Sequence, residues 1–459
     1  MNSLMKAHRT TELAPSTAAF GAKRGQFGVN VIGHVSANIG IGVSARYLVQ
    51  LLLDRNCPVA IFDMDPGLGR GKYDLTFDRF ALQRVEDLPY SINLVILPAA
   101  TLPHFFLDVL PRWSDGLNVG LIYWEISAIP QLWKEALHLF DVMVAPSNYI
   151  RSVFEAQLSG VRHVSLTHPI YCPDDIRPSR ARFGLSNDEV VFITGFEPTS
   201  DPQRKNPFAA VQAFQTAFGS DTRARLIIKV NNSNAAGEGR SLLERLKQRC
   251  AADSRISINE EKLSYTEVLT LYSSCDVFVS LHRSEGLGLA LMEAMALGKP
   301  VIATGWSGNM TYMNHTNSCL VRYRLIAVEG ALSVYKRRFL EKDTVWADPD
   351  IEDAALWMKR LANDRALRVA VGAKAAADIA SFHNEACRAT FLDELRAISE
   401  QQAFLPKWTE SKRRHRDNLQ RLAHPPTKER IDAMVRALRR ARAKTHRLLD
   451  RYVLWRFRA

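Results

Sequence analysis

Short apolar runs alternate with helix-length segments along most of the chain. The runs hold consecutive apolar residues, which is the pattern of parallel strands that helices cover on both faces. The first series comprises residues 27–33, 59–63, 94–97, 119–123, 142–145 and 164–167. The second series comprises residues 190–194, 225–230, 257–259, 277–281 and 301–304. Two such series predict an α/β fold built from two doubly wound, Rossmann-like domains.

Breaks in this pattern predict the domain organisation. Residues 1–26 are small, polar and without periodicity, as expected of a loose leader. The segment 168–186 is rich in Pro, Asp and Arg, and we interpret it as the linker. We therefore expect an N-terminal domain at 27–175, a C-terminal domain at 176–400 and a tail at 401–459. Helical periodicity within the last part of the C-terminal domain covers residues 351–367 and 370–399.

The net charge of +12 comes from one part of the chain. The sequence has 60 Lys and Arg against 48 Asp and Glu, and residues 401–459 alone hold 17 basic and 5 acidic residues. The first 400 residues are therefore neutral. The pI of 9.5 is consequently no argument that the body of the protein binds nucleic acid.

Composition excludes several classes of protein. With 47% hydrophobic and 24% charged residues, the chain is not mainly disordered. We expect no membrane-spanning helix, because no run approaches about 18 apolar residues, and no secretory signal. The six cysteines form no C-x-x-C pair, which favours reduced thiols in a cytoplasmic protein over disulfides or a zinc site. No other cluster has metal-ligand spacing, so we expect neither a metal nor a cofactor.

Ligands of open α/β sheets bind beyond the carboxyl ends of the strands, which makes the loops there the candidate sites. After the first strand, Gly40 and Gly42 would let the backbone approach a phosphate at a helix N-terminus. A tight strand-to-helix turn is the alternative. The pair lacks the third glycine of a dinucleotide fingerprint, which argues against a Rossmann dehydrogenase.

A basic pair, Arg204 and Lys205, follows the first strand of the second series and precedes a predicted helix at 208–218. Two adjacent cations at this position would neutralise a diphosphate, the Arg through its planar fork and the Lys as a point charge. The alternative is a solvated basic loop.

The richest segment is residues 280–300, where a strand enters a loop and a helix begins near Gly288. Glu285 precedes the helix and Glu293 lies inside it, so we expect about 8–12 Å between the two carboxylates. The amides of residues 286–289 lie between them and form a positive helix N-terminus. This arrangement suits a nucleotide diphosphate sugar. The alternative is a capping Glu285 and a solvent-exposed Glu293.

The same segment, SEGLGLALMEAMALGKPVIAT, resembles the E-x7-E signature of the family 4 retaining glycosyltransferases, which have the GT-B fold of two Rossmann-like domains facing a crevice. The basic pair begins a second similar segment, RKNPFAAVQAFQTAF. SLHRSEGLGL and GWSGNMTYM resemble a bacterial subgroup that works on polysaccharides and lipid-linked glycans. VGLIYWEISAIP and DVMVAPSNYIRSVF extend the resemblance into the N-terminal domain. It covers about residues 27–395.

The resemblance implies roles for the acidic and basic residues. Glu293 is similar to the family's ribose-binding glutamate, and Glu285 matches the glutamate that faces the donor sugar. Lys205 matches the diphosphate clamp, and Arg204 is expected to substitute for an arginine that many members carry where this chain has Gly195 and Phe196.

It also implies contacts to the donor from the loops. The amides of Gly286, Leu287 and Gly288 match those on the sugar and phosphate, while Gly40 and Gly42 fall in the loop that closes over the phosphate. The remaining expectations concern four further residues. Ser307 and Asn309 are expected to touch the donor, with glycine-rich turn chemistry as the alternative explanation. Trp124 and Glu125 stand where many members place a sugar-contacting histidine. We interpret His282 as a loop histidine satisfied by backbone rather than as a catalytic residue.

We therefore expect a retaining glycosyltransferase that moves a sugar, mannose by analogy with the subgroup, from a nucleotide diphosphate donor to a glycan or lipid-linked acceptor hydroxyl in polysaccharide biosynthesis. Catalysis is assigned to Glu285, Lys205, Arg204 and Glu125. A non-catalytic scaffold of the same fold that binds a nucleotide sugar or glycan is the alternative.

The tail predicts a membrane contact. Within residues 429–457, apolar residues recur at three- and four-residue steps among many arginines, as in an amphipathic helix lying on an anionic membrane. We expect a cytoplasmic protein held at the inner face of the cell membrane. A helix docked on the body is the alternative, and we expect no nucleic-acid partner because no motif for one is present.

Overall fold

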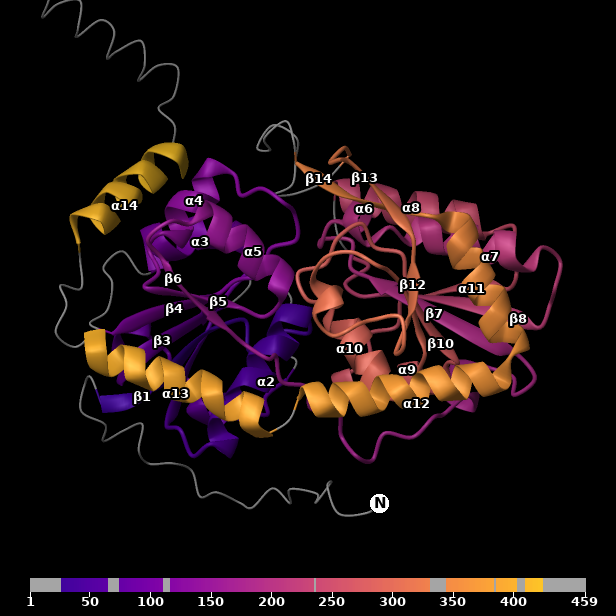
Figure 1. Cartoon of the computed structure of the whole chain (residues 1–459), viewed down its shortest axis with the longest axis horizontal. Coiled ribbons are helices and arrows are strands. Elements are labelled where there is room, and N and C mark those ends of the chain that lie inside the picture. The colour runs from indigo at the N-terminus through magenta and orange to yellow at the C-terminus, as the bar shows by residue number, and fades with distance from the viewer. Residues whose placement is uncertain are drawn as a thin grey trace, which may run out of the picture.

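The structure, a computed structural model, describes residues 26–64, 74–109, 116–234, 237–330, 344–383, 385–402 and 409–423 (Figure 1). Two six-stranded parallel sheets with flanking helices form two α/β domains. The predicted fold class is thereby confirmed, and each of the eleven predicted runs corresponds to a strand. Three of them, Val59–Asp63, Val142–Ala145 and Val301–Thr304, begin and end where the apolar runs do.

The N-terminal sheet has the strand order β2-β1-β3-β4-β5-β6, with every neighbouring pair parallel. Its strands are β1 (Gln26–Gly33), β2 (Val59–Asp63), β3 (Tyr90–Ile96), β4 (Leu117–Leu121), β5 (Val142–Ala145) and β6 (Arg162–Ser165). Its helices are α2 (Gly40–Asp54), α3 (Leu102–His104), α4 (Gln131–Leu137) and α5 (Asn148–Gln157). Strands β1–β5 are mainly apolar because helices cover both faces, whereas the edge strand β6, with the sequence RHVS, is mostly polar.

The C-terminal sheet has the order β12-β11-β10-β7-β8-β9 and is also parallel. Its strands are β7 (Val190–Phe196), β8 (Ala224–Val230), β9 (Ile256–Asn259), β10 (Val277–Ser280), β11 (Val301–Thr304) and β12 (Cys319–Val321). Its helices are α6 (Pro202–Lys205), α7 (Pro207–Phe218), α8 (Gly237–Cys250), α9 (Tyr265–Ser274), α10 (Leu289–Ala296), α11 (Ile351–Asn363) and α12 (Arg365–Phe382).

An antiparallel hairpin, β13 (Tyr323–Ala327) with β14 (Val345–Pro349), lies outside both sheets and was not predicted. Trp346 of β14 is buried in a core cluster of the N-terminal domain, and Ile326 of β13 packs against that cluster. The hairpin therefore links the two domains.

The last helices return to the N-terminal domain (Figure 1). The periodicity at 370–399 belongs to two helices, α12 and α13 (Glu385–Gln402). Four apolar residues of α13 pack in the core of the N-terminal sheet: Phe391, Leu392, Leu395 and Ile398. The sequence placed residues up to 400 in the C-terminal domain, whereas α13 completes the N-terminal one.

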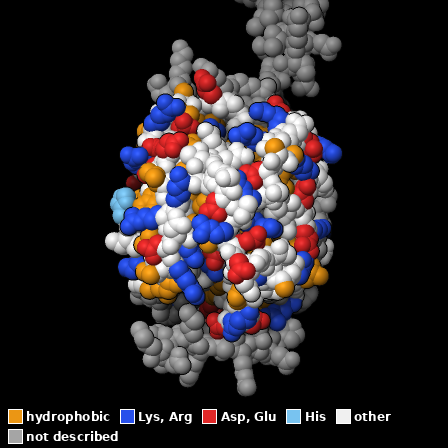
Figure 2. All heavy atoms as spheres, turned by 90° about the vertical axis from the view of Figure 1, so that its right-hand side faces the viewer, with side chains coloured by type: hydrophobic (Ala, Val, Ile, Leu, Met, Phe, Trp, Pro, Cys, Tyr) orange, Lys and Arg blue, Asp and Glu red, His pale blue; other side chains and the backbone are white. Residues whose placement is uncertain are grey.

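The first part of the predicted tail is a helix docked on the body. In α14 (Glu410–Ala423), Leu419 is fully buried in the N-terminal core, and Lys412 forms an ion pair with Asp141. The residues predicted to lie on a membrane, 429–457, are outside the described residues. Figure 2 shows basic and acidic side chains interspersed on the face that it presents. No helix within the described ranges has the length and apolarity needed to cross a bilayer.

Candidate active site

The basic pair lies on a short helical turn that its own sequence holds in place. The Asp201 carboxylate caps α6 by accepting hydrogen bonds from the amides of Gln203 (3.1 Å) and Arg204 (3.2 Å). Asn206 ends the turn in the left-handed region, at φ 53°, and α7 begins directly after it. The turn follows β7, so it presents Arg204 and Lys205 at the carboxyl end of the C-terminal sheet.

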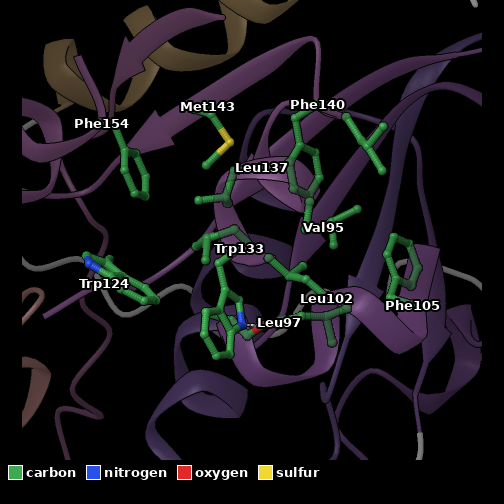
Figure 3. Close-up of a cluster of buried hydrophobic side chains, with 14 of the residues drawn as sticks. Val95, Leu97, Leu102, Phe105, Trp124, Trp133, Leu137, Phe140, Met143 and Phe154 are labelled. Carbon is green, nitrogen blue, oxygen red and sulfur yellow. Dashed lines mark hydrogen bonds between the residues drawn. The ribbon is translucent and has the colours of Figure 1, made fainter. Parts of the chain in front are cut away.

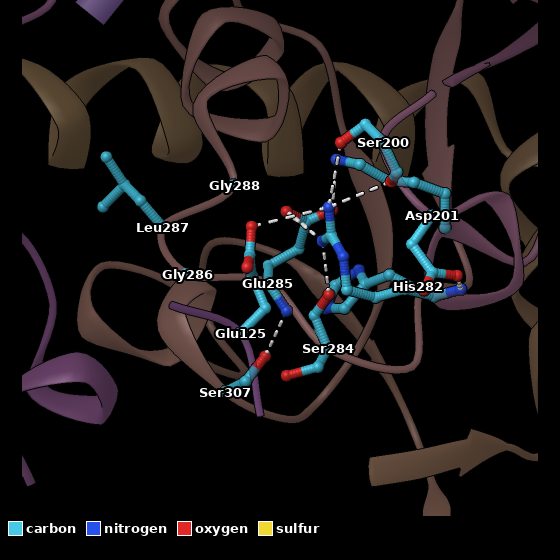
Figure 4. A network of polar contacts seen from close by, with 12 residues as sticks. Glu125, Ser200, Asp201, His282, Ser284, Glu285, Gly286, Leu287, Gly288 and Ser307 are labelled. Carbon is cyan, nitrogen blue, oxygen red and sulfur yellow. Dashed lines mark hydrogen bonds and ion pairs between the residues drawn. The ribbon is translucent and has the colours of Figure 1, made fainter. Parts of the chain in front are cut away.

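Two cations and two carboxylates meet at this edge, and Figure 4 labels the carboxylate residues, Glu125 and Glu285. The Arg204 guanidinium, 3% exposed, donates through Nη1 to the Ser284 carbonyl oxygen (2.8 Å) and to Glu285 Oε2 (3.2 Å). Lys205 Nζ lies 2.5 Å from Glu285 Oε1. Glu125, which follows β4 of the other domain, places Oε1 3.6 Å from Arg204 Nη2. The four residues that the sequence assigned to catalysis therefore form one cluster.

The cluster controls the charge of its carboxyl groups. Burial alone would raise the pKa of Glu285, but Lys205 and Arg204 outweigh it and lower the pKa to about 2. The pKa of Glu125 is raised, first by burial and then by the Glu285 charge, although Arg204 opposes the rise. Glu285 is therefore ionised at neutral pH and has little tendency to take up a proton.

The loop after Glu285 approaches the N-terminal domain closely. A Cβ on Gly286 would lie 3.2 Å from Ile150 Cδ1 and 3.3 Å from the Trp124 carbonyl oxygen, so glycine permits this approach. Gly288 has φ +86° and directly precedes α10, as predicted. The Tyr312 hydroxyl contacts the carbonyl oxygens of Leu287 (3.0 Å) and Gly288 (2.8 Å), which fixes the turn.

Ser307 and Gly308, in the loop after β11, hold the backbone of Glu285. The Glu285 amide donates to Ser307 Oγ (2.8 Å), and the Gly308 amide donates to the Glu285 carbonyl oxygen (2.9 Å). Ser307 itself has φ 78°, a conformation that costs a non-glycine residue energy and is often found at functional sites. The loop after β11 therefore positions the carboxylate.

His282 is satisfied by one backbone carbonyl, as predicted, and by two side chains, and both partners of its Nε2 come from the loop after β11. Its Nε2 faces the Trp306 carbonyl oxygen (3.3 Å) and Asn309 Oδ1 (3.2 Å), and its Nδ1 faces Ser280 Oγ (3.0 Å). Two acceptors around Nε2 favour the neutral Nε2–H tautomer, and burial lowers the pKa of the ring. Asn309 is thus fully buried and ties the loop after β11 to the loop after β10.

Glu293 lies in a second polar group, eight residues further along. It is 4% exposed, and its Oε1 accepts a hydrogen bond from the Tyr265 hydroxyl (2.8 Å). Tyr265 accepts one in turn from Tyr47 of α2. Burial raises the pKa of Glu293 to about 7, opposed by the Tyr265 hydrogen bond and the Arg46 charge. The alternative of a solvent-exposed Glu293 is therefore excluded.

The two predicted glycines of the first loop lie at the start of α2. A Cβ on Gly40 would have no heavy atom within 4 Å, whereas one on Gly42 would lie 2.4 Å from the Ala37 carbonyl oxygen. Gly42 is thus required by the tight turn. The same helix carries Tyr47 towards Glu293 and contacts α10, so the loop borders the site.

Trp124 is not part of the polar cluster. Its side chain is fully buried in the core of the N-terminal domain (Figure 3), where Nε1 donates to the Ala128 carbonyl oxygen (3.1 Å). Its carbonyl oxygen approaches Gly286. The sugar-contacting role considered for its side chain is therefore not supported, because the ring is enclosed by apolar neighbours.

Several site residues had not been identified from the sequence. Asp201 carried a usable signal, since an Asp directly before Pro marks a helix start. Tyr47, Tyr265 and Tyr312 carried none, because distant segments bring them to the site. In the part of the chain that the structure describes, no three His, Cys, Asp or Glu side chains are grouped to hold a metal ion.

Known proteins resemble the chain in both sequence and fold. Residues 201–323 match the family described as glycosyl transferases group 1. D-inositol 3-phosphate glycosyltransferase of Mycobacterium tuberculosis (strain H37Rv) is 26% identical over 174 residues, which are 36% of this chain. The match spans about a third (34%) of that relative's length.

Three solved structures share the fold. Sucrose-phosphate synthase from Thermosynechococcus elongatus has a TM-score of 0.60 at 15% identity, covering 82% of this chain and 100% of its own. Anabaena HepE in complex with UDP-glucose has a TM-score of 0.53 at 14% identity, and the match covers 82% of this chain and 100% of HepE. An E. coli structure bound with UDP-2-fluoro glucose has a TM-score of 0.55 at 11% identity, and the match covers 80% of this chain and 99% of the E. coli chain. Both sequence matches are to glycosyltransferases.

Proposed function

We propose that this chain, whose residues 201–323 carry the glycosyl transferases group 1 match, is a retaining glycosyltransferase that transfers one sugar from a nucleotide diphosphate sugar to a hydroxyl of a glycan or lipid-linked acceptor. The observation that carries the proposal is the cluster of Arg204, Lys205 and Glu285, the first and last of them buried, at the carboxyl end of the C-terminal sheet. Mannose is the candidate sugar by subgroup resemblance.

The cluster suits departure of a diphosphate. The bond between the anomeric carbon and the phosphate oxygen breaks, and Lys205 and Arg204 stabilise the charge that develops on the phosphate. The acceptor oxygen bonds to the anomeric carbon on the same face, and its proton passes to the leaving phosphate oxygen. A carboxyl with a pKa of about 2, as in Glu285, is a poor base, which agrees with such a route.

The nucleoside end is assigned to Glu293 on α10. Its carboxylate would accept hydrogen bonds from the ribose hydroxyls in place of the Tyr265 hydroxyl that it now accepts from. The fold relatives bound to UDP-glucose and UDP-2-fluoro glucose make uridine donors worth testing beside GDP-mannose.

Donor hydrolysis tests the proposal. UDP-glucose, UDP-galactose, UDP-N-acetylglucosamine and GDP-mannose are incubated with the protein, and release of nucleoside diphosphate is measured. We expect one donor to be consumed, and NMR of the first product should show the donor's anomeric configuration. An inverted product would contradict the proposed retention of configuration. Binding without turnover of any donor would favour a non-catalytic scaffold that binds nucleotide sugars. If the protein neither binds nor turns over any donor, both the transferase and the scaffold are refuted.

We further propose that the C-terminal tail holds the protein at the inner face of the cell membrane. The support is the basic, amphipathic sequence of residues 429–457. Liposomes with anionic lipid should pellet the full chain at low salt and release it at high salt. A chain truncated after Ala423 keeps the docked α14 and should no longer pellet; equal pelleting would show that the tail is not the anchor.

A further inference from the structure

Three side chains beside the charged cluster have buried polar atoms without hydrogen-bond partners among the described residues. The atoms are the Tyr149 hydroxyl oxygen, Ser284 Oγ and Trp306 Nε1. Tyr149 lies close enough to Ser284 for that hydroxyl to oppose the burial-driven rise in its pKa, yet the two oxygens do not meet hydrogen-bond geometry. Since buried polar groups are nearly always paired, three such groups in one region indicate a place where a ligand completes the bonding.

The three residues come from both domains and include two aromatic rings in contact. Tyr149 is on α5 of the N-terminal domain, and its ring lies 5.9 Å from that of Trp306, inclined at 66°. Trp306, in the loop after β11, lies 5.4 Å from the Tyr323 ring of β13. Tyr323 is 39% exposed and Leu325, two residues on, is 48% exposed. The rings thus lead from the buried hydroxyls to the solvent.

This group adjoins the reacting centre rather than the nucleoside end. Ser284 directly precedes Glu285, and its carbonyl oxygen accepts the hydrogen bond from Arg204. Tyr149 is close enough to Glu125 for that carboxylate to add to the rise in its pKa. Glu293, at the other end of the loop and helix, pairs instead with Tyr265.

The charges near the rings are already paired. Arg322 lies 3.1 Å from Asp350, and Arg324 lies 3.2 Å from Asp348. A neutral ligand with both C–H faces and hydroxyl groups matches the region better, because aromatic rings pack on such faces and the three polar atoms bond hydroxyls.

We propose that Tyr149, Ser284, Trp306 and Tyr323 form the subsite for a neutral pyranose of the acceptor. The inference rests on the proposed function and deepens it: the hydroxyl that receives the sugar belongs to an uncharged sugar ring. On this basis an inositol phosphate, the substrate in the name of the mycobacterial relative, is not the preferred acceptor of this chain.

Binding of simple sugars tests the subsite without any need for turnover. Methyl glucopyranoside, galactopyranoside and mannopyranoside are examined by saturation-transfer NMR with the full chain, beside inositol 3-phosphate. At least one neutral pyranoside should bind, and Trp306→Ala and Tyr149→Phe should weaken it, Trp306→Ala by about tenfold. Trp306→Phe keeps a ring but lacks the N–H group, so its pyranoside affinity should lie between those of wild type and Trp306→Ala.

Controls separate this inference from the proposed function. Trp357→Phe changes a tryptophan on α11 whose Nε1 donates to the Leu320 carbonyl oxygen, and it should leave pyranoside binding unchanged. UDP and GDP titrations should give the same affinity for wild type and Trp306→Phe. Unchanged pyranoside binding in all three variants at the site, or preference for inositol 3-phosphate, would overturn the subsite. Absence of nucleotide binding in the wild type would instead count against the proposed function.

Where transfer to a pyranoside is measurable, kinetics provide a second readout. The acceptor KM should rise by about tenfold in Trp306→Ala, while the donor KM changes little. A rise confined to the donor KM would assign Trp306 to the donor side and overturn the proposal.

Discussion

Replacing Glu293 by Gln should stabilise the protein at neutral pH while weakening nucleotide binding. The carboxyl is 4% exposed, and burial raises its pKa to about 7 from an ordinary 4.5. The folded state therefore binds the proton more tightly than the unfolded state. Gln keeps an oxygen for the Tyr265 hydroxyl and carries no charge that burial could penalise.

The magnitude follows from linkage between proton binding and folding. Below pH 4.5 Glu293 is protonated in both states, and it carries no penalty. Between pH 4.5 and 7 the unfolded state releases its proton first, so the free energy of unfolding falls as the pH rises. A difference of 2.5 pKa units corresponds to about 3 kcal/mol, of which about 2.5 kcal/mol develops between pH 5 and pH 8.

Urea unfolding followed by circular dichroism at pH 5 and pH 8 measures this effect. The gain of Glu293→Gln over wild type should grow by about 2.5 kcal/mol across the interval. Glu267→Gln on α9 is the matched control with opposite sign, because hydrogen bonds from Ser264 lower the pKa of Glu267. Parallel pH curves for wild type and Glu293→Gln would refute the reasoning.

The same variant should bind a nucleoside diphosphate more than tenfold more weakly in calorimetry, because a hydrogen bond to a charged group is worth about 1.5–3 kcal/mol. Undiminished affinity in a folded Glu293→Gln protein would show that Glu293 does not hold the ribose.

Three further predictions concern other parts of the molecule. Lys205→Ala should lower kcat by about 10² or more, and wild-type turnover would contradict the phosphate role. Gly308→Ala should abolish turnover in a donor assay, because its Cβ would lie 2.0 Å from a backbone carbonyl oxygen of the loop after β10, whereas Gly305→Ala, with a nearest contact of 3.4 Å, should be tolerated. Leu419→Ala should lower the free energy of unfolding by about 2–5 kcal/mol and expose α14 to proteolysis. Leu422→Ala, at a position that is 45% exposed, is the control and should do neither. Equal protection of both variants from proteolysis would argue against the docked helix.

The sequence predicted the strands well because each strand of a covered parallel sheet is a continuous apolar run. It did not predict β12, which has three residues, or the hairpin β13–β14, whose first strand is largely exposed. Periodicity also predicted helix over residues 370–399, which the structure divides between α12 and α13. It carried no information on which domain α13 covers, since either sheet offers a suitable surface.

For the candidate site, too, the sequence predicted the residues that lie close together along the chain and missed the partners that packing brings to them. Glu285 and Glu293 share one loop and helix, and Arg204 with Lys205 share one turn, so their spacing along the chain is informative. Their partners lie far away in sequence. Tyr265 meets Glu293, and Ser147 of α5 donates to the Gly286 carbonyl oxygen (2.6 Å), only after the sheets and helices have packed.

The return of α13 to the N-terminal sheet has a consequence for the order in which the chain acquires its structure. The strands β1–β6 are synthesised by residue 165, but Phe391 and Leu395, which cover part of their core, follow about 225 residues later. At about 5–20 residues per second, the ribosome needs roughly 10–45 s to supply them. During that interval the C-terminal domain is synthesised, while the earlier domain still shows an apolar surface. The domain that begins first along the chain is thus completed last, which makes it the natural client of chaperones during translation.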